Sequence, residues 1–148
     1  MADLPAGRLR REWRLRREHS VLKRVGFYAT AEEVLELKGP VAVSAEDTIV
    51  RYLEEGELLV ATDSWVDDLV DPDIKRICQY SIRTDGVWVW PSSLVYYLVR
   101  YHTELPDDFL RHMDASGWTV PTLDEAALDA VMDQFMLEES LDPEEPDA

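Results

Sequence analysis

Five aspartates and a tryptophan stand close together between residues 62 and 73, where their types and spacing offer the best prospect of chemistry. They are Asp63, Trp65, Asp67, Asp68, Asp71 and Asp73. Clustered carboxylates can bind Mg²⁺ or Ca²⁺, but this spacing lacks the glycine that follows alternating acidic positions in the calcium-binding loop. A one-turn helix capped by Asp63 or Ser64 explains the pattern equally well. We therefore expect no metal and no cofactor, and interpret the segment as a protein-binding surface with Trp65 as its anchor.

Nucleophilic or acid–base catalysis needs a reactive side chain with a partner in reach, and the candidates are Cys78, the serines and three histidines. None stands in a recognised catalytic motif, and the sequence contains no CxxC, GxGxxG, phosphate-binding loop or HExxH. Cys78 alternates with strand residues and is expected to be a small buried apolar side chain. We expect His102 and His112 to cap helices or face solvent. The sequence nominates no catalytic residue, and a small enzyme of unknown reaction remains only a second alternative.

A basic segment, RLRREWRLRREHSVLKR, spans residues 8–24 and holds eight basic and two acidic side chains. It has no proline or glycine and predicts a basic, weakly amphipathic helix within residues 1–25. Arginine runs with an interleaved tryptophan are compatible with phosphate backbones. The candidate nucleic-acid contacts are Arg10, Arg11, Arg14 and Arg17. The other interpretation is that this helix docks on carboxylates of the same protein or of another molecule.

The whole chain is strongly acidic, with 31 acidic and 15 basic side chains and a formal net charge of −16. Residues 1–38 carry nine basic and six acidic side chains, whereas the remainder carries six basic and 25 acidic. An acidic body repels nucleic-acid phosphates and accelerates association with basic proteins. A basic protein is therefore the expected partner and nucleic-acid association the first alternative, although solubility alone would also account for the charge.

Length and composition place the chain among single-domain proteins. A chain of 148 residues with 46% hydrophobic residues is long enough to bury one core. Its single cysteine, the absence of a signal segment and the absence of a long apolar run predict a cytoplasmic location away from membranes. Twelve arginines against three lysines, with no asparagine, indicate a GC-rich bacterial source.

The elements that must position these residues are organised around residues 83–113. Residues 77–83 alternate as a strand and should pair with residues 87–90 through the Asp85-Gly86 turn. Further helices are expected at residues 30–38, 44–56, 92–102, 106–116 and 123–137. We expect an α+β fold in which a small antiparallel sheet is covered by several helices. Residues 26–138 form the single core domain, with Trp90 in its core, and residues 139–148 are an acidic disordered tail.

The stretch from Trp88 to Trp118 combines several short motifs. They are Trp88-x-Trp90-Pro91, the Tyr96-Tyr97 pair, Leu105-Pro106-x-x-Phe109, His112-Met113 and Gly117-Trp118. With the helix end Tyr52-Leu53-x-x-Gly56, this half of the chain resembles small, largely uncharacterised acidic α+β proteins of actinobacteria. Some proteins of that general kind are immunity partners of polymorphic toxins. The resemblance and the charge favour a non-catalytic immunity or antitoxin-like protein that occludes a basic site on its partner.

Overall fold

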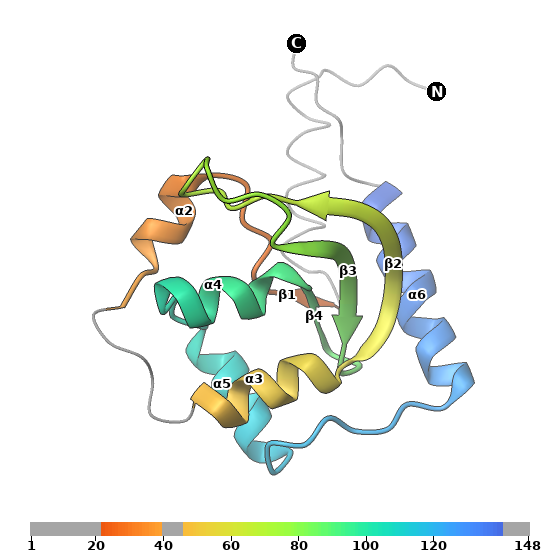
Figure 1. Cartoon of the computed structure of the whole chain (residues 1–148). Coiled ribbons are helices and arrows are strands. Elements are labelled where there is room, and N and C mark those ends of the chain that lie inside the picture. The colour runs from red at the N-terminus through yellow and green to blue at the C-terminus, as the bar shows by residue number, and fades with distance from the viewer. Residues whose placement is uncertain (1–21, 40–45, 141–148) are drawn as a thin grey trace, which may run out of the picture.

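The computed structural model describes residues 22–39 and 46–140, which form a four-stranded sheet with helices on both faces (Figure 1). In chain order the elements are β1 (Lys23–Arg24), α2 (Ala31–Glu36), α3 (Glu46–Glu55), β2 (Glu57–Val66), β3 (Cys78–Thr84), β4 (Trp88–Pro91), α4 (Ser93–Tyr101), α5 (Asp107–Ala115) and α6 (Glu125–Ser140). The predicted α+β fold is confirmed. The sequence also favours a short strand at Val41-Ala42-Val43, and these residues lie outside the described part of the chain.

The sheet has the order β1-β4-β3-β2. β2 pairs with β3, and β3 with β4, in antiparallel register, whereas β1 runs parallel to β4. The sheet is therefore mixed, and the expectation of a purely antiparallel sheet is wrong at β1. The physical reason is the second edge of β4, whose backbone groups need partners. The carbonyls of Val87 and Val89 accept hydrogen bonds from the amides of Lys23 and Val25, at 2.9 and 3.1 Å.

The turn that joins β3 to β4 follows the sequence prediction. Gly86 has a φ of 102°, a conformation that other residues rarely adopt. The Asp85 carboxylate accepts hydrogen bonds from the amides of Val87 and Trp88, at 2.9 and 2.8 Å. The turn thus satisfies its own backbone donors, and the two strands leave it in a defined register.

Side chains of β4 alternate between two separate cores. Trp88 and Trp90 face α3, α4 and α5, where they pack against residues such as Phe109. Val89 points to the opposite face and packs with Phe135 of α6. Figure 1 shows α6 on one side of the sheet and α3, α4 and α5 on the other. The expectation that helices 92–102 and 123–137 cover the sheet is confirmed: α4 covers one face and α6 covers the other.

The two ends of the predicted domain differ from expectation. At residues 23–24 the structure has a strand, so the predicted basic helix is wrong there, and the rest of that helix lies outside the described residues. Leu22 and Val25 enter different cores, which an extended backbone permits and a helix does not. At the other end α6 continues to Ser140, two residues beyond the expected end of the core domain at residue 138.

Candidate functional site

The acidic segment of residues 63–73 begins on an edge strand. Asp63 and Trp65 lie within β2, which pairs only with β3 among the described strands. The expected one-turn helix at Asp63 or Ser64 is therefore wrong. The local backbone is held by Thr62 instead. Its Oγ1 accepts a hydrogen bond from the Ser64 amide at 3.1 Å and donates one to the Tyr80 carbonyl at 2.9 Å. Both Asp63 and Trp65 are exposed, and the Trp65 side chain retains 48% of its accessible surface.

Asp68 is the one member of the proposed surface that the structure removes from it. The residue is only 4% exposed. Its Oδ2 accepts hydrogen bonds from the hydroxyls of Tyr96 and Tyr101, and its Oδ1 accepts hydrogen bonds from the amides of Val70 and Asp71. The assignment of Asp68 to a partner-binding surface is therefore wrong, because a carboxylate held by these donors serves to fasten the loop after β2 onto α4.

Burial by itself would raise the pKa of Asp68. The hydrogen bonds from Tyr96, the Asp71 amide, Tyr101 and the Val70 amide outweigh burial and hold this pKa below its ordinary value. Asp68 therefore carries its charge throughout the neutral range. The same contact works in the opposite direction on Tyr96, whose pKa is raised by burial and then by the Asp68 carboxylate.

The remaining aspartates stay at the surface. Asp67 lies 3.8 Å from the Lys75 ammonium group and accepts a hydrogen bond from the Arg76 amide at 3.0 Å. The Arg76 guanidinium lies 5.3 Å from the centre of the Trp65 ring. Asp73 is exposed. The surface around Trp65 is thus a mixed one in which two basic side chains stand among the carboxylates.

The loop geometry offers little to a cation. The Asp71 carboxylate accepts a hydrogen bond from the Asp73 amide at 3.0 Å, so this carboxylate is tied to the local backbone. Among residues 22–39 and 46–140, no group of three or more His, Cys, Asp or Glu side chains is placed to hold a metal ion. The described loop therefore gives no geometric support to metal chemistry.

Asp85 is a second buried carboxylate. The sequence predicted only its position in the turn and not the burial of its side chain. Its side chain is sealed from solvent, and its Oδ2 accepts a hydrogen bond from the Tyr52 hydroxyl at 2.6 Å. The same oxygen lies 3.1 Å from Nε2 of His112, but the two groups are not aligned as a hydrogen bond. Burial, followed by the Asp85 hydrogen bond and charge, raises the pKa of Tyr52. Because Asp85 also holds the turn amides, the arrangement anchors the hairpin to α3 and α5.

The other candidates for catalysis have structural roles. Cys78 is half-buried rather than fully buried, and its Sγ lies 3.6 Å from the Ser92 Oγ. The Ser92 hydroxyl accepts a hydrogen bond from the Ser81 amide and donates one to the Gln79 carbonyl, so it fastens β3 to the start of α4. His102 ends α4 with a φ of 54°, which confirms the expectation that it serves as a cap. His19 lies outside the described residues.

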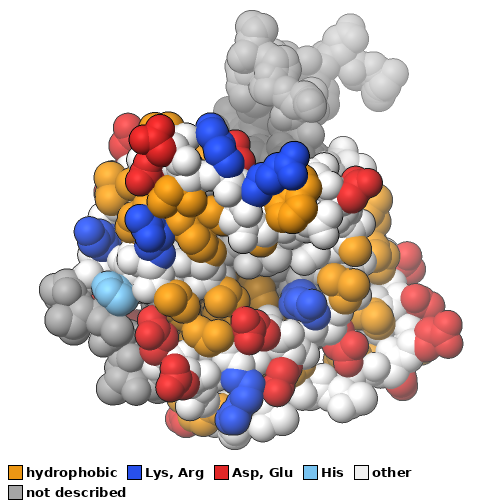
Figure 2. Space-filling model, viewed as in Figure 1, with side chains coloured by type: hydrophobic (Ala, Val, Ile, Leu, Met, Phe, Trp, Pro, Cys, Tyr) orange, Lys and Arg blue, Asp and Glu red, His pale blue; other side chains and the backbone are white. Residues whose placement is uncertain are grey.

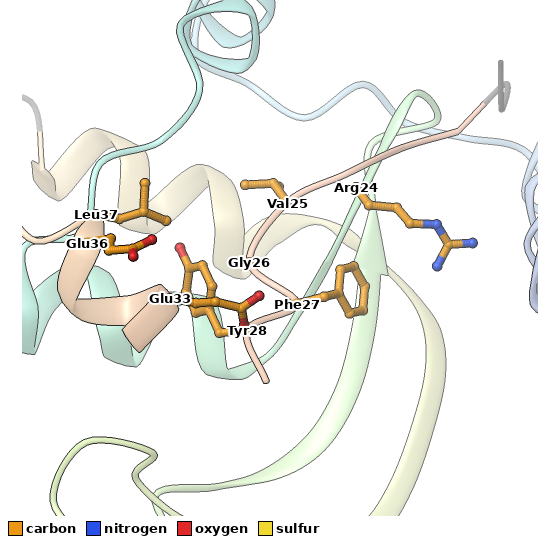
Figure 3. Close-up of a pocket in the computed structure, with 8 residues that line it drawn as sticks. All are labelled: Arg24, Val25, Gly26, Phe27, Tyr28, Glu33, Glu36 and Leu37. Carbon is orange, nitrogen blue, oxygen red and sulfur yellow. The ribbon is translucent and has the colours of Figure 1, made fainter. Parts of the chain in front are cut away.

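Two shallow pockets flank the extended segment after β1. One, of about 390 Å³, is lined by Arg24, Val25, Gly26, Phe27, Tyr28, Glu33, Glu36 and Leu37. The other, of about 430 Å³, shares this segment and adds Glu104, Leu105, Pro106 and Asp107. Figure 3 shows Arg24 at one end of the first pocket, pointing away from Glu33 and Glu36. Glu33 is committed to its own helix, because its Oε1 accepts the amides of Ala29 and Thr30.

The basic segment ends at Lys23 and Arg24, whose positive charges are paired with carboxylates of the same chain. Arg24 lies 3.1 Å from Glu138 and 2.8 Å from Glu139, and its guanidinium lies over the Phe135 ring. Lys23 lies 3.9 Å from Asp108. The candidate nucleic-acid contacts Arg10, Arg11, Arg14 and Arg17 fall outside the described residues. What the structure does show is that the end of this segment binds carboxylates of its own chain.

Comparison with known proteins returned no matching family model, no matching curated protein and no matching solved structure. Among the described residues, no helix is both long enough and apolar enough to cross a membrane.

Proposed function

We propose that this chain is a non-catalytic protein-binding protein of the immunity or antitoxin kind, which occludes a basic site on a partner protein. The observation that carries the proposal is the half-exposed indole of Trp65 on an edge strand, next to the exposed carboxylates of Asp63 and Asp67. Tryptophan is among the residues that dominate interface energies when a partner covers them, and surrounding charged groups set specificity.

The position of Arg76 adds to this proposal. Its guanidinium already lies over the Trp65 ring, so the indole presents a face suited to a cation. A basic side chain of the partner would take a similar position on the exposed part of the ring. The carboxylates of Asp63 and Asp67 beside Trp65, and the exposed Asp73 further along the loop, would pair with further cations on the partner.

The net charge supports the same class of partner. With a formal charge of −16, the chain attracts a basic surface over several ångströms and raises its association rate at low salt. An enzyme that acts on nucleic acid presents such a basic surface. Occluding it requires binding alone and no chemistry from this chain.

The test is a pull-down from the native host with the tagged full chain, followed by reconstitution with the purified partner. Trp65→Ala and the double variant Asp63→Lys with Asp67→Lys are each expected to raise the Kd about 10- to 100-fold. The matched control is Glu54→Lys with Glu55→Lys, which makes the same charge change at exposed positions near the end of α3. The control should change the Kd by less than about threefold.

Two results would contradict the proposal in different ways. If no protein is retained in stoichiometric amount, the proposed function is wrong. If a partner is retained but both double variants weaken it equally, or neither does, the assignment to the Trp65 surface is wrong.

A further inference from the structure

Strand β2 forms one edge of the sheet, and three of its apolar residues are exposed there. Leu58 retains 47% and Trp65 retains 48% of its accessible surface, and Ala61 between them is also exposed. Figure 2 shows hydrophobic side chains at the surface along the course that β2 takes in Figure 1. Among the described strands β2 pairs only with β3, so no described strand covers its outer edge. We name Leu58, Ala61 and Trp65 the β2 row.

The register with β3 places the whole β2 row on one face of the sheet. The row pairs with alternate residues of β3, namely Leu58 with Arg83, Ala61 with Ser81 and Trp65 with Gln79. Alternate residues of a strand point to one face, and directly opposed residues of neighbouring strands share a face. Leu58 and Trp65 are seven residues apart and would lie on opposite faces of a regular strand. The irregularities of β2 on either side of Val60 and Ala61 bring them to the same face.

The β2 row is symmetric about Ala61. Measured along β3, Leu58 and Trp65 each lie two residues from the position opposite Ala61, which is a distance of about 7 Å. If two β2 strands run antiparallel about a two-fold axis at Ala61, each Leu58 meets a Trp65 and the two alanines meet each other. The small alanine side chain at the axis permits the strands to approach closely. Both large exposed side chains of each copy thus gain an apolar partner.

The charges beside the β2 row are complementary in the same arrangement. Arg83 shares the face of Leu58, and its guanidinium donates a hydrogen bond to the Gly56 carbonyl at 2.8 Å, next to the start of β2. Asp63 is exposed and stands two residues before Trp65. Within residues 22–39 and 46–140, neither Arg83 nor Asp63 forms an ion pair. Because Trp65 of one copy meets Leu58 of the other, the antiparallel arrangement brings Asp63 of one copy towards Arg83 of the other.

We propose that a second copy of this chain docks on the outer edge of β2, antiparallel about a two-fold axis at Ala61. Leu58 of each copy packs against Trp65 of the other, and Arg83 of each copy pairs with Asp63 of the other. The contact joins the two sheets edge to edge, which is how exposed edge strands associate. It does not rest on the proposed function. Because the contact covers Trp65, a partner protein that binds this indole has to displace the second copy.

The net charge of −16 opposes the association of two copies. At 0.15 M salt the Debye length is about 8 Å, so carboxylates remote from the β2 row contribute little repulsion. Near the row, basic side chains stand among the carboxylates: Lys75 lies 3.8 Å from Asp67, and the Arg76 guanidinium lies over the Trp65 ring. The repulsion at this edge is therefore small. Since the contact itself is also small, we expect a reversible dimer with a Kd of about 10–100 μM.

The first experiment is sedimentation equilibrium of the purified full chain at concentrations up to about 0.5 mM. Leu58→Ala and Trp65→Ala should each raise the Kd of the dimer about tenfold. The matched control is Leu35→Ala, the same substitution at a leucine of α2 that is also 47% exposed, and it should change the Kd by less than about twofold. A chain that stays monomeric, or β2 variants that raise the Kd no more than the control does, would overturn the proposal.

The second experiment compares Asp63→Arg with Asp73→Arg, the same change at an exposed aspartate further along the loop after β2. Both variants replace a negative charge by a positive one, so both reduce the general repulsion between copies. Only Asp63→Arg sets two arginines against each other, and it should raise the Kd about fivefold, whereas Asp73→Arg should leave the Kd unchanged or lower it. A dimer that both variants tighten equally would overturn the pairing of Asp63 with Arg83.

The third experiment tests the position of the two-fold axis. Cys78 is the single cysteine of the chain, so Cys78→Ser with Ala61→Cys leaves one thiol, placed at the axis. Directly opposed residues of antiparallel strands have Cα atoms about 4.5–5.5 Å apart, which suits a disulfide. In a glutathione redox buffer this variant should form covalent dimers at least about tenfold faster than Cys78→Ser with Ala130→Cys, which places the thiol at an exposed alanine of α6. Equal rates would overturn the arrangement about Ala61.

Discussion

Replacing Asp68 with alanine tests whether this carboxylate stabilises the fold while the neighbouring aspartates at the surface do not. The residue stands in the middle of an aspartate-rich segment, yet its side chain is sealed from solvent and accepts hydrogen bonds from two tyrosine hydroxyls and two amides. The matched control is Asp73→Ala, the same chemical change at an exposed position of the same loop. Only the first change should affect stability.

The expected magnitude follows from which donors lose a partner. The amides of Val70 and Asp71 lie in a half-exposed loop and regain hydrogen bonds to water. The hydroxyl of Tyr101 is buried and that of Tyr96 partly so, and a hydrogen bond to a charged group contributes about 1.5–3 kcal/mol. Asp68→Ala should therefore lower the free energy of unfolding by about 3–5 kcal/mol, whereas Asp73→Ala should change it by less than about 0.5 kcal/mol.

Acid pH gives an independent check on the same carboxylate. A carboxyl group whose pKa is lower in the folded state than in the unfolded state stabilises the fold while it is ionised. Its contribution is complete above the unfolded pKa of about 3.9 and is lost as the pH falls through the lower folded value. The stability difference between the parent and Asp68→Asn should therefore be constant near neutrality and shrink below about pH 4.

Urea unfolding followed by far-ultraviolet circular dichroism measures these differences at pH 7 and at several acid values. Asp68→Asn keeps the shape of the side chain and should lose about half as much stability as Asp68→Ala, because an amide still accepts at one oxygen. If Asp68→Ala unfolds at the same urea concentration as Asp73→Ala, Asp68 does not fasten the loop to α4.

Other positions test the two cores and the hairpin. Trp90→Ala should lower the free energy of unfolding by about 3–5 kcal/mol, because the indole is 1% exposed and donates a hydrogen bond to a backbone carbonyl. Trp65→Ala should lower it by less than about 1 kcal/mol. Equal losses of stability in thermal melts would contradict the assignment of Trp90 to the core and Trp65 to the surface. Gly56→Ala should cost about 1–3 kcal/mol because the added carbon would lie 2.6 Å from the Trp90 ring, and a melting temperature equal to the parent's would argue against that contact. Asp85→Ala should cost about 2–4 kcal/mol and speed hydrogen exchange of the turn amides, and unchanged exchange would show that the carboxylate does not hold the hairpin.

Local patterns in the chain were sufficient for most of the fold. The Asp85-Gly86 turn between alternating residues predicted the β3–β4 hairpin, because tight turns need a positive φ that glycine supplies at low cost. The apolar residues of α4 and the stripe on α6 predicted two covering helices. The two-residue strand β1 escaped prediction, because its pairing with β4 depends on a backbone edge far along the chain and not on its own residues.

The candidate site divides in the same way. Composition and spacing alone identified an acidic chain with a tryptophan among aspartates, since charge and side-chain type are properties of single residues. Only the tertiary structure decided that Asp68 is buried beneath Tyr96 and Tyr101 while Asp67 stays in solvent. Two adjacent aspartates are chemically identical in the sequence. Which of them becomes structural depends on hydroxyl donors about 30 residues away, and such a long-range partner leaves no signal in the local pattern.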